Sequence, residues 1–182
     1  MSRYPANMIT LPTDFTLTIR PMLLEDLPAV QELDRLSFSL PWPASSFRYE
    51  LLENEHSQLW VAEVQYPEGQ KTVVGAIVVW LVVDEAHIAT LAVHPDYRQM
   101  GIGKRLLITA LRAALQEGMH MATLEVRAGN RAAQALYQQF GFKVVGERHG
   151  YYQDNHEDAL IMTLASIEEK TLSHLEQEMQ KD

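Results

Sequence analysis

The chain has 182 residues, of which 47% are hydrophobic, a formal net charge of −9 at pH 7 and no cysteine. This length suits one domain with a substantial core, and the apolar fraction excludes a disordered polypeptide. The lack of cysteine excludes disulfides, zinc–thiolate sites and a cysteine nucleophile, and the acidic charge disfavours direct binding to nucleic acid.

No signal for membrane insertion or export is evident. The sequence contains no run of 18 apolar residues, and prolines and polar residues stand near the N-terminus where a signal peptide needs a hydrophobic segment. We therefore expect a cytoplasmic protein with no membrane partner.

The first half of the chain alternates strand and helix patterns. Residues 1–15 contain two prolines and no periodicity, so we expect a flexible N-terminal arm. Alternating polarity predicts a strand over 16–20, and leucines at helical spacing predict a helix that Asp26 caps and that ends near Pro41. The same rules predict a short helix over 47–53 and strands over 58–65 and 72–83.

The stretch 86–117 organises the rest of the chain. Residues 86–93 form an apolar run of strand length, and from Ile102 onward apolar residues recur at helical spacing. Two glycines, Gly101 and Gly103, lie at the junction between the predicted strand and the predicted helix. The first amides of a helix have no intrahelical partners and carry the positive end of the dipole, and glycine lets a ligand approach the backbone. The junction therefore predicts an anion-binding site.

Two better-known glycine motifs do not fit this junction. A dinucleotide fingerprint needs a third glycine three residues beyond Gly103, where this chain has Leu106. A nucleoside-triphosphate loop needs serine or threonine after Lys104, where this chain has Arg105. The anion is therefore not expected to be a dinucleotide or a nucleoside triphosphate bound in these ways.

The second half of the chain continues the alternation. A strand is predicted over 121–126, and a helix follows that Asn130 caps and Gly141 ends. Further strands are predicted over 143–149 and 159–164. Residues 166–182 form a polar C-terminal helix with a narrow apolar stripe, which we expect to lie on the surface and to be dispensable for chemistry. The order of elements predicts a single α/β domain over 16–165, a mixed central sheet with helices on both faces.

The order Arg-x-x-Gly-x-Gly after an apolar strand resembles the pyrophosphate-binding motif of the GCN5-related N-acetyltransferases (GNAT), and residues 17–164 look like the GNAT fold. The resemblance implies acetyl-coenzyme A as cosubstrate, with its pyrophosphate on the loop and helix start. It also implies that strand amides before the loop hold the thioester carbonyl and that Asn130 bonds the pantetheine arm, although Asn130 can also be a plain helix cap. The implied cofactor-binding residues are Leu91, Ala92, Val93, Arg98, Gln99, Met100, Gly101, Ile102, Gly103, Lys104 and Asn130.

One branch of that family matches more closely. The RimI-type enzymes acetylate the N-terminal amine of a small-subunit ribosomal protein, and this resemblance implies a protein N-terminus as the substrate. The arm and the tail fall outside the family's minimal pattern, so the partner and the oligomeric state stay open. The similar blocks are 19–22 with Pro41–Trp42, 124–130 with 135–137, and Tyr151–Tyr152 with 157–162.

Glu125 lies in an apolar strand, where a charge is costly without a partner or a function. By the resemblance it is the general base, acting directly or through water; the alternative is an edge-strand carboxylate paired with Arg127 or another base. Deprotonating an α-amine of pKa about 8 costs about 1 kcal/mol near pH 7.4, whereas a lysine of pKa about 10.4 costs about 4. A single carboxylate base therefore favours an N-terminus as substrate.

Tyr137 is by the resemblance the general acid that protonates the coenzyme thiolate. The alternative is a core tyrosine on a helix face, since aromatic residues at helical spacing usually pack. Tyr151 and Tyr152 occupy a polar loop, where they either line the substrate entrance or pack at a strand end. Seven histidines lack metal-ligand spacing, His87 and His94 among them, and we expect no metal site.

Two other functions compete with N-terminal acetylation. An enzyme of the same fold could act on a small-molecule amine such as a polyamine. A non-catalytic regulator could bind acyl-coenzyme A without turnover, but the presence of both Glu125 and Tyr137 argues against it.

Overall fold

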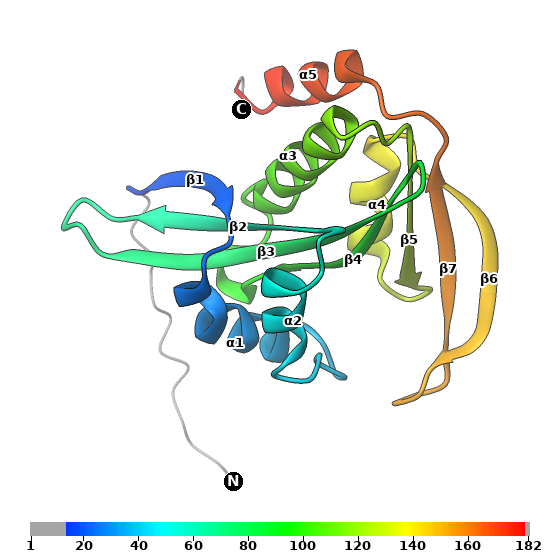
Figure 1. Ribbon diagram of the computed structural model, residues 1–182, viewed down its shortest axis with the longest axis horizontal. Helices are drawn as coiled ribbons and strands as arrows, with labels where there is room; N and C mark the ends of the chain where they lie inside the picture. Colours follow the sequence, from blue (N-terminus) through cyan, green and yellow to red (C-terminus); the bar gives the residue numbers. More distant parts are fainter. Residues whose placement is uncertain (1–13, 181–182) are drawn as a thin grey trace, which may run out of the picture.

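Helices cover both faces of one seven-stranded sheet in the computed structural model, which describes residues 14–180 (Figure 1). The predicted arm therefore lies almost wholly outside the described residues. Two 3₁₀ turns, Leu24–Asp26 and Pro95–Tyr97, accompany the helices. The elements are β1 (Thr16–Pro21), α1 (Leu27–Ser37), α2 (Ser46–Leu52), β2 (Ser57–Gln65), β3 (Lys71–Val82), β4 (Glu85–Val93), α3 (Ile102–Gln116), β5 (Met121–Arg127), α4 (Arg131–Gln139), β6 (Lys143–Tyr152), β7 (Glu157–Leu164) and α5 (Glu169–Glu178).

The sheet is mixed, as predicted. Its strand order is β1-β2-β3-β4-β5-β7-β6, and neighbours run antiparallel except for the central pair β4 and β5. The parallel pair requires a crossover, and α3 supplies it between the end of β4 and the start of β5. Among the described residues only β4 and β5 run parallel, and the predicted anion-binding loop follows the end of β4.

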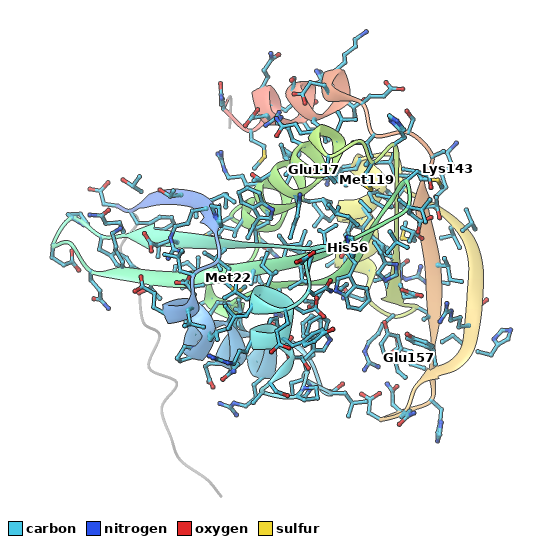
Figure 2. All side chains as sticks on the ribbon, in the orientation of Figure 1. Met22, His56, Glu117, Met119, Lys143 and Glu157 are labelled. Carbon is cyan, nitrogen blue, oxygen red and sulfur yellow. The ribbon has the colours of Figure 1, made fainter. Side chains whose placement is uncertain are left out.

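Each face of the sheet has its own hydrophobic cluster. On one face, α1 and α2 pack over β2, β3 and β4; on the other, α3 packs over the same strands and α5 packs on α3 (Figure 1). Side chains fill the space between helices and sheet in Figure 2, which marks Met22 from the first cluster and Met119 from the second. Helices on both faces confirm the predicted fold class. Within residues 14–180, no helix is long and apolar enough to cross a membrane.

Asp26 does not cap the first helix as predicted. Its carboxylate instead accepts hydrogen bonds from the Arg20 guanidinium at 2.7 and 2.9 Å and from the Leu23 amide at 2.8 Å. Arg20 also donates to Glu63, and these bonds lower the pKa of both carboxyl groups despite the opposing effect of burial. The carboxylate that the sequence pattern assigned to capping α1 is instead part of an ion-pair network that links β1, β2 and the start of α1.

The last two strands are longer than predicted. β6 continues to Tyr152 and β7 already begins at Glu157, so only residues 153–156 form the connection. The register between the two strands shifts between Arg148 and Tyr152, and this irregularity accommodates the polar residues that the sequence suggested as a loop. Tyr151 and Tyr152 therefore lie at the end of a strand.

The C-terminal helix belongs to the hydrophobic core, contrary to the expectation of a helix that lies on the surface. Leu172 is 1% exposed, and Leu175 and Ile167 are buried beside it in the cluster that includes α3. Arg112 on α3 donates to Glu169 and Glu176 on α5, each at 3.0 Å. The apolar stripe is narrow, but its leucines are buried because α5 packs on α3.

We expect Leu172→Ala to lower the free energy of unfolding by about 2 to 5 kcal/mol, the usual cost of a buried leucine truncated to alanine. Urea unfolding followed by circular dichroism measures this. Gln177→Ala, at an exposed position of the same helix, is the control and should change stability by less than about 0.5 kcal/mol. A Leu172→Ala protein as stable as the wild type would contradict a core role for α5.

Candidate active site

β4 and β5 separate along their length and leave a gap in the middle of the sheet. Only Glu85, Ala86 and His87 of β4 pair with β5, although both strands continue for several residues beyond. The last strand pair is His87 with Thr123. The remaining backbone groups on the facing edges of the two strands are therefore available to a ligand in the gap.

A groove of about 610 Å³ opens at this gap, a size typical of small-molecule sites. The end of α1, the end of β4, the following loop, the first turn of α3 and one side of α4 line it. Met100 is the one predicted cofactor-binding residue outside the lining, and its side chain is exposed. The predicted residues that the groove brings together are Leu91, Ala92, Val93, Arg98, Gln99, Gly101, Ile102, Gly103, Lys104, Asn130 and Tyr137.

The loop before α3 has the backbone that the glycine motif predicts. Gly101 precedes the first helical residue with φ of +74°, a left-handed conformation that glycine adopts without strain. Gln99 also has a positive φ of +65°. The Arg98 side chain donates from Nε to the Val93 carbonyl at 3.1 Å and so ties the loop to the end of β4. The loop thus presents the first amides of α3 to the groove.

The end of α5 borders this loop. Lys104, on the first turn of α3, lies 3.7 Å through Nζ from a carboxylate oxygen of Glu178. The Met179 methyl group would be 2.8 Å from a Cβ added at Gly101. α5 therefore contacts the predicted anion-binding loop as well as the core.

Asn130 caps α4, with its Oδ1 accepting from the Ala133 amide at 3.1 Å, and it also lines the groove. The capping half of its prediction is confirmed by this bond. Sequence reasoning missed Gln134, a buried residue one turn further along α4. Its Nε2 donates to the Arg127 and Ala128 carbonyls at 3.0 and 2.9 Å, which fixes the turn between β5 and α4.

Tyr137 lines the groove and is 7% exposed. Burial raises the pKa of its phenol well above the ordinary value, and the nearby Tyr152 adds to the shift. The hydroxyl group therefore keeps its proton throughout the neutral range. The ring packs against Phe142 at 5.7 Å, so Tyr137 is both a packing residue and a proton-bearing group at the groove.

Glu125 lies on the opposite face of the sheet from α3, in the half-buried row of β5. It does not pair with Arg127 and does not line the groove. Its Oε2 lies 3.3 Å from His87 Nε2, and its Oε1 lies 3.2 Å from Arg148 Nη2. β5 has neighbours on both sides, but at Glu125 only β7 pairs with it. The alternative role as a carboxylate paired with a base is thus realised through His87 and Arg148.

Arg127 joins two segments on the face of the sheet that carries Glu125. Its guanidinium donates to Asp154 at 2.9 Å, to Glu157 at 3.1 Å and to Ser39 Oγ at 3.0 Å. Ser39 Oγ also bonds the Asp154 carboxylate directly. The segment between α1 and α2 is therefore linked to the β6–β7 connection, a link that no local sequence pattern could indicate.

The two tyrosines at the end of β6 differ in environment. Tyr151 is exposed, with the Arg148 guanidinium 5.3 Å from its ring centre. Tyr152 is half-buried beneath the Arg127 guanidinium, 3.8 Å from its ring centre, and the two rings meet edge to face. Tyr151 lies beside Arg148 and Tyr152 beside Arg127, and neither tyrosine lines the groove.

Two other features of the described surface are structural. Among residues 14–180, one three-residue group has metal-ligand spacing: Glu147, His149 and Asp158. In this group His149 bonds Asp158 at 3.2 Å.

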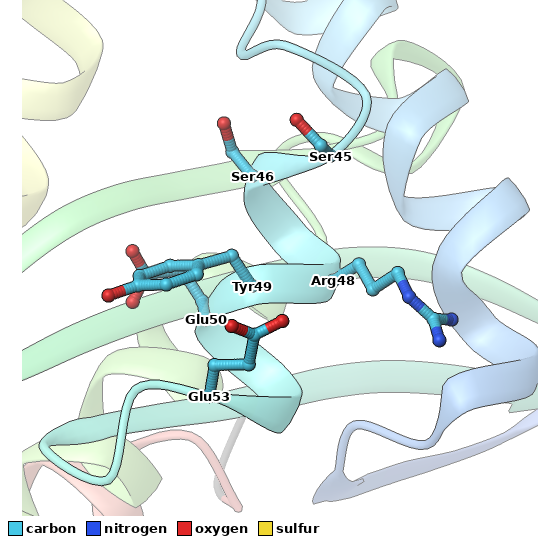
Figure 3. A pocket seen from close by; sticks show the side chains of 6 residues that line it. All are labelled: Ser45, Ser46, Arg48, Tyr49, Glu50 and Glu53. Atoms are coloured by element: carbon cyan, nitrogen blue, oxygen red, sulfur yellow. The ribbon is translucent and has the colours of Figure 1, made fainter.

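A smaller hollow of about 400 Å³ lies on α2, where Arg48 points away from Tyr49 (Figure 3). In that hollow Glu50 Oε2 accepts from Trp80 and Asn54, so this oxygen already has two partners.

Comparison with known proteins places this arrangement in a family. A sequence profile of the acetyltransferase (GNAT) family matches residues 27–142. The putative ribosomal protein bS18-alanine N-acetyltransferase of Bacillus subtilis (strain 168) is 40% identical over 144 residues, which cover 79% of this chain and 92% of that protein. The chain belongs to the GNAT family, as the motif predicted, and is an N-acetyltransferase.

Solved structures agree with this assignment. The ribosomal-protein-S18-alanine N-acetyltransferase from Escherichia coli superposes with a TM-score of 0.72 at 31% identity, covering 84% of this chain and 96% of that one. The NatC complex bound to Gag peptide and CoA contains a chain that matches with a TM-score of 0.74 at 25% identity, covering 82% and 98%.

Proposed function

We propose that this protein transfers the acetyl group of acetyl-coenzyme A to the N-terminal α-amine of a protein, with ribosomal protein bS18 as the acceptor. The observation that carries the proposal is the groove along the unpaired end of β4, with Glu125 beside His87 where the gap between β4 and β5 begins. The names of the Bacillus subtilis and Escherichia coli relatives supply the acceptor.

The residues around the groove fit acetyl-coenzyme A. The first amides of α3 and the left-handed Gly101 suit the pyrophosphate, because they offer unpaired donors and the positive end of the helix dipole. Lys104 adds a positive charge to the same turn. Leu91, Ala92 and Val93 line the groove at the end of β4 that does not pair with β5, where their backbone would hold the pantetheine arm and the thioester carbonyl. The bound coenzyme supplies an activated acetyl group as a thioester.

The two sides of the gap carry opposite proton functions. Glu125, on the face of α1 and α2, would take a proton from the substrate ammonium and leave a neutral amine. Tyr137, at the groove on the face of α4, would give a proton to the departing thiolate. The strands separate between these residues, so amine and thioester would meet from opposite sides.

We expect acetylation at the α-amine of an unblocked peptide with the N-terminal sequence of bS18 that lacks lysine. The reason is that a carboxylate base overcomes the roughly 1 kcal/mol cost of an α-amine more readily than the roughly 4 kcal/mol cost of a lysine. Mass spectrometry after incubation with acetyl-coenzyme A locates the product. The matched control is the same peptide with a blocked N-terminus and one lysine, which should stay unmodified.

Two results would contradict the proposal. Acetyl groups found only on lysine side chains would reassign the acceptor to an internal amine. Robust turnover of a polyamine with none on any peptide would reassign it to a small molecule.

A further inference from the structure

We propose that His87 is a positioning residue that holds the Glu125 carboxylate in place for proton transfer from the substrate amine. The inference rests on the proposed role of Glu125 as base and adds to it a second residue, on the neighbouring strand. His87 is the last residue of β4 that pairs with β5, so it lies where the gap begins.

The strand register brings the two side chains together. His87 is paired with Thr123, and Glu125 follows Thr123 by two residues, so all three side chains project from the same face of the sheet. His87 Nε2 and Glu125 Oε2 are 3.3 Å apart, and both side chains are partly buried. Because strand register fixes this contact, it does not depend on a mobile loop.

Packing fixes the plane of the His87 ring. The ring stacks on Trp80, with centres 5.4 Å apart and an angle of 11° between the planes. Trp80 stacks in turn on Trp42 at 6.1 Å, and its Nε1 donates to Glu50 Oε2 at 2.9 Å. This support runs from α2 through β3 to β4. The edge of the imidazole is thus held toward Glu125.

The two oxygens of Glu125 have partners of different character. Arg148, which contacts Oε1 at 3.2 Å, comes from the outermost strand β6, and its side chain is 51% exposed. An exposed arginine can move aside at small cost. His87, which contacts Oε2, is fixed by its stack. The geometry therefore assigns Oε2 to anchoring and leaves Oε1 for the incoming amine.

This division has a chemical consequence. When an N–H bond of the ammonium breaks, its proton forms an O–H bond on Oε1 and the electron pair stays on nitrogen, ready to attack the thioester carbonyl. His87 Nε2, 3.3 Å from Oε2, keeps the carboxylate oriented so that Oε1 faces the incoming amine. Losing this contact should therefore slow the proton transfer.

Two substitutions separate positioning from packing. His87→Gln keeps an N–H group near the Nε2 position, whereas His87→Phe keeps a ring on Trp80 but has no polar group. We expect kcat of His87→Phe to fall about 10- to 100-fold, the range for losing a polar partner of a charged group. His87→Gln should stay within about threefold of wild type. The KM for acetyl-coenzyme A should not change in either variant.

A double substitution tests whether His87 acts through Glu125. In a Glu125→Gln background, adding His87→Phe should lower kcat by less than about twofold, because the carboxylate that it positions is gone. His120→Phe, at an exposed histidine before β5, is the control and should match wild type. Circular dichroism confirms that every variant is folded.

The outcomes are distinguishable. A wild-type kcat for His87→Phe, a His87→Gln variant slower than His87→Phe, or a His87→Phe loss of full size in the Glu125→Gln background would each overturn the positioning role. If Glu125→Gln itself keeps wild-type kcat, the base assignment fails, and the inference fails with it for that separate reason.

Discussion

Tyr137→Phe is expected to lower kcat by about 10²- to 10⁴-fold while leaving the affinity for acetyl-coenzyme A within about twofold, the range for losing a general acid. Phenylalanine fills the same buried space, so packing against Phe142 and the shape of the groove are kept. Only the hydroxyl group is removed. Burial raises the pKa of this phenol, so the wild-type group still carries the proton at every pH where the enzyme would be assayed.

The pH dependence distinguishes this loss from loss of a base. A missing base matters less as rising pH deprotonates the amine without help, but a missing proton donor for the thiolate is not replaced by hydroxide. The deficit of Tyr137→Phe should therefore persist between pH 7 and pH 9, measured as kcat/KM with the bS18 peptide. Tyr66→Phe is the control, because it also removes a buried tyrosine hydroxyl, one bonded to Tyr97. A kcat/KM of Tyr137→Phe within about threefold of wild type would assign the residue to packing alone.

Local patterns predicted most of the fold. The change of period from strand to helix at Ile102, and the glycines before it, depend on neighbouring residues, and the structure has a helix starting at that residue after a left-handed glycine. Strands β1 to β5 lie within one residue of their predicted limits, since alternation reports burial directly, whereas β6 and β7 are longer than predicted. Asp26 is the instructive exception, because an arginine on another element competes for the carboxylate that a local rule assigns to capping.

The contacts that complete the site could not be predicted in this way. Glu125 meets His87 because two strands pair in one particular register, and Arg127 reaches Ser39 across 88 positions of sequence. The sequence marked Glu125 as a charge in need of a partner but offered several candidates. Only the fold decides among them.

The prediction that the C-terminal helix lies on the surface was wrong for a related reason. Its apolar stripe looks too narrow for a core element when the helix is considered alone. The stripe is sufficient because Leu172 and Leu175 are buried in the cluster that includes α3, and α5 packs on that helix. The width of an apolar stripe describes one helix alone. Whether the stripe is buried also depends on the apolar surface of the element that it packs against.

Gly103→Val is expected to weaken acetyl-coenzyme A binding by at least about 100-fold in a protein that stays folded. Gly103 lies in the first turn of α3 and lines the groove, where valine would crowd the amides that serve the pyrophosphate. The fold should tolerate the change. A Cβ at this position lies 3.4 Å from the Leu136 side chain and 3.7 Å from that of Val93, and valine has a slightly higher helix propensity than glycine.

Isothermal titration calorimetry with acetyl-coenzyme A measures the effect, and thermal unfolding checks the fold. Ala113→Val, a half-buried position on the same helix away from the groove, is the matched control and should bind with wild-type affinity. Gly101→Val is a poorer test, because φ of +74° strains any side chain there and a loss of binding could follow from a distorted loop. Unchanged affinity in a folded Gly103→Val protein would show that the pyrophosphate does not bind at the start of α3.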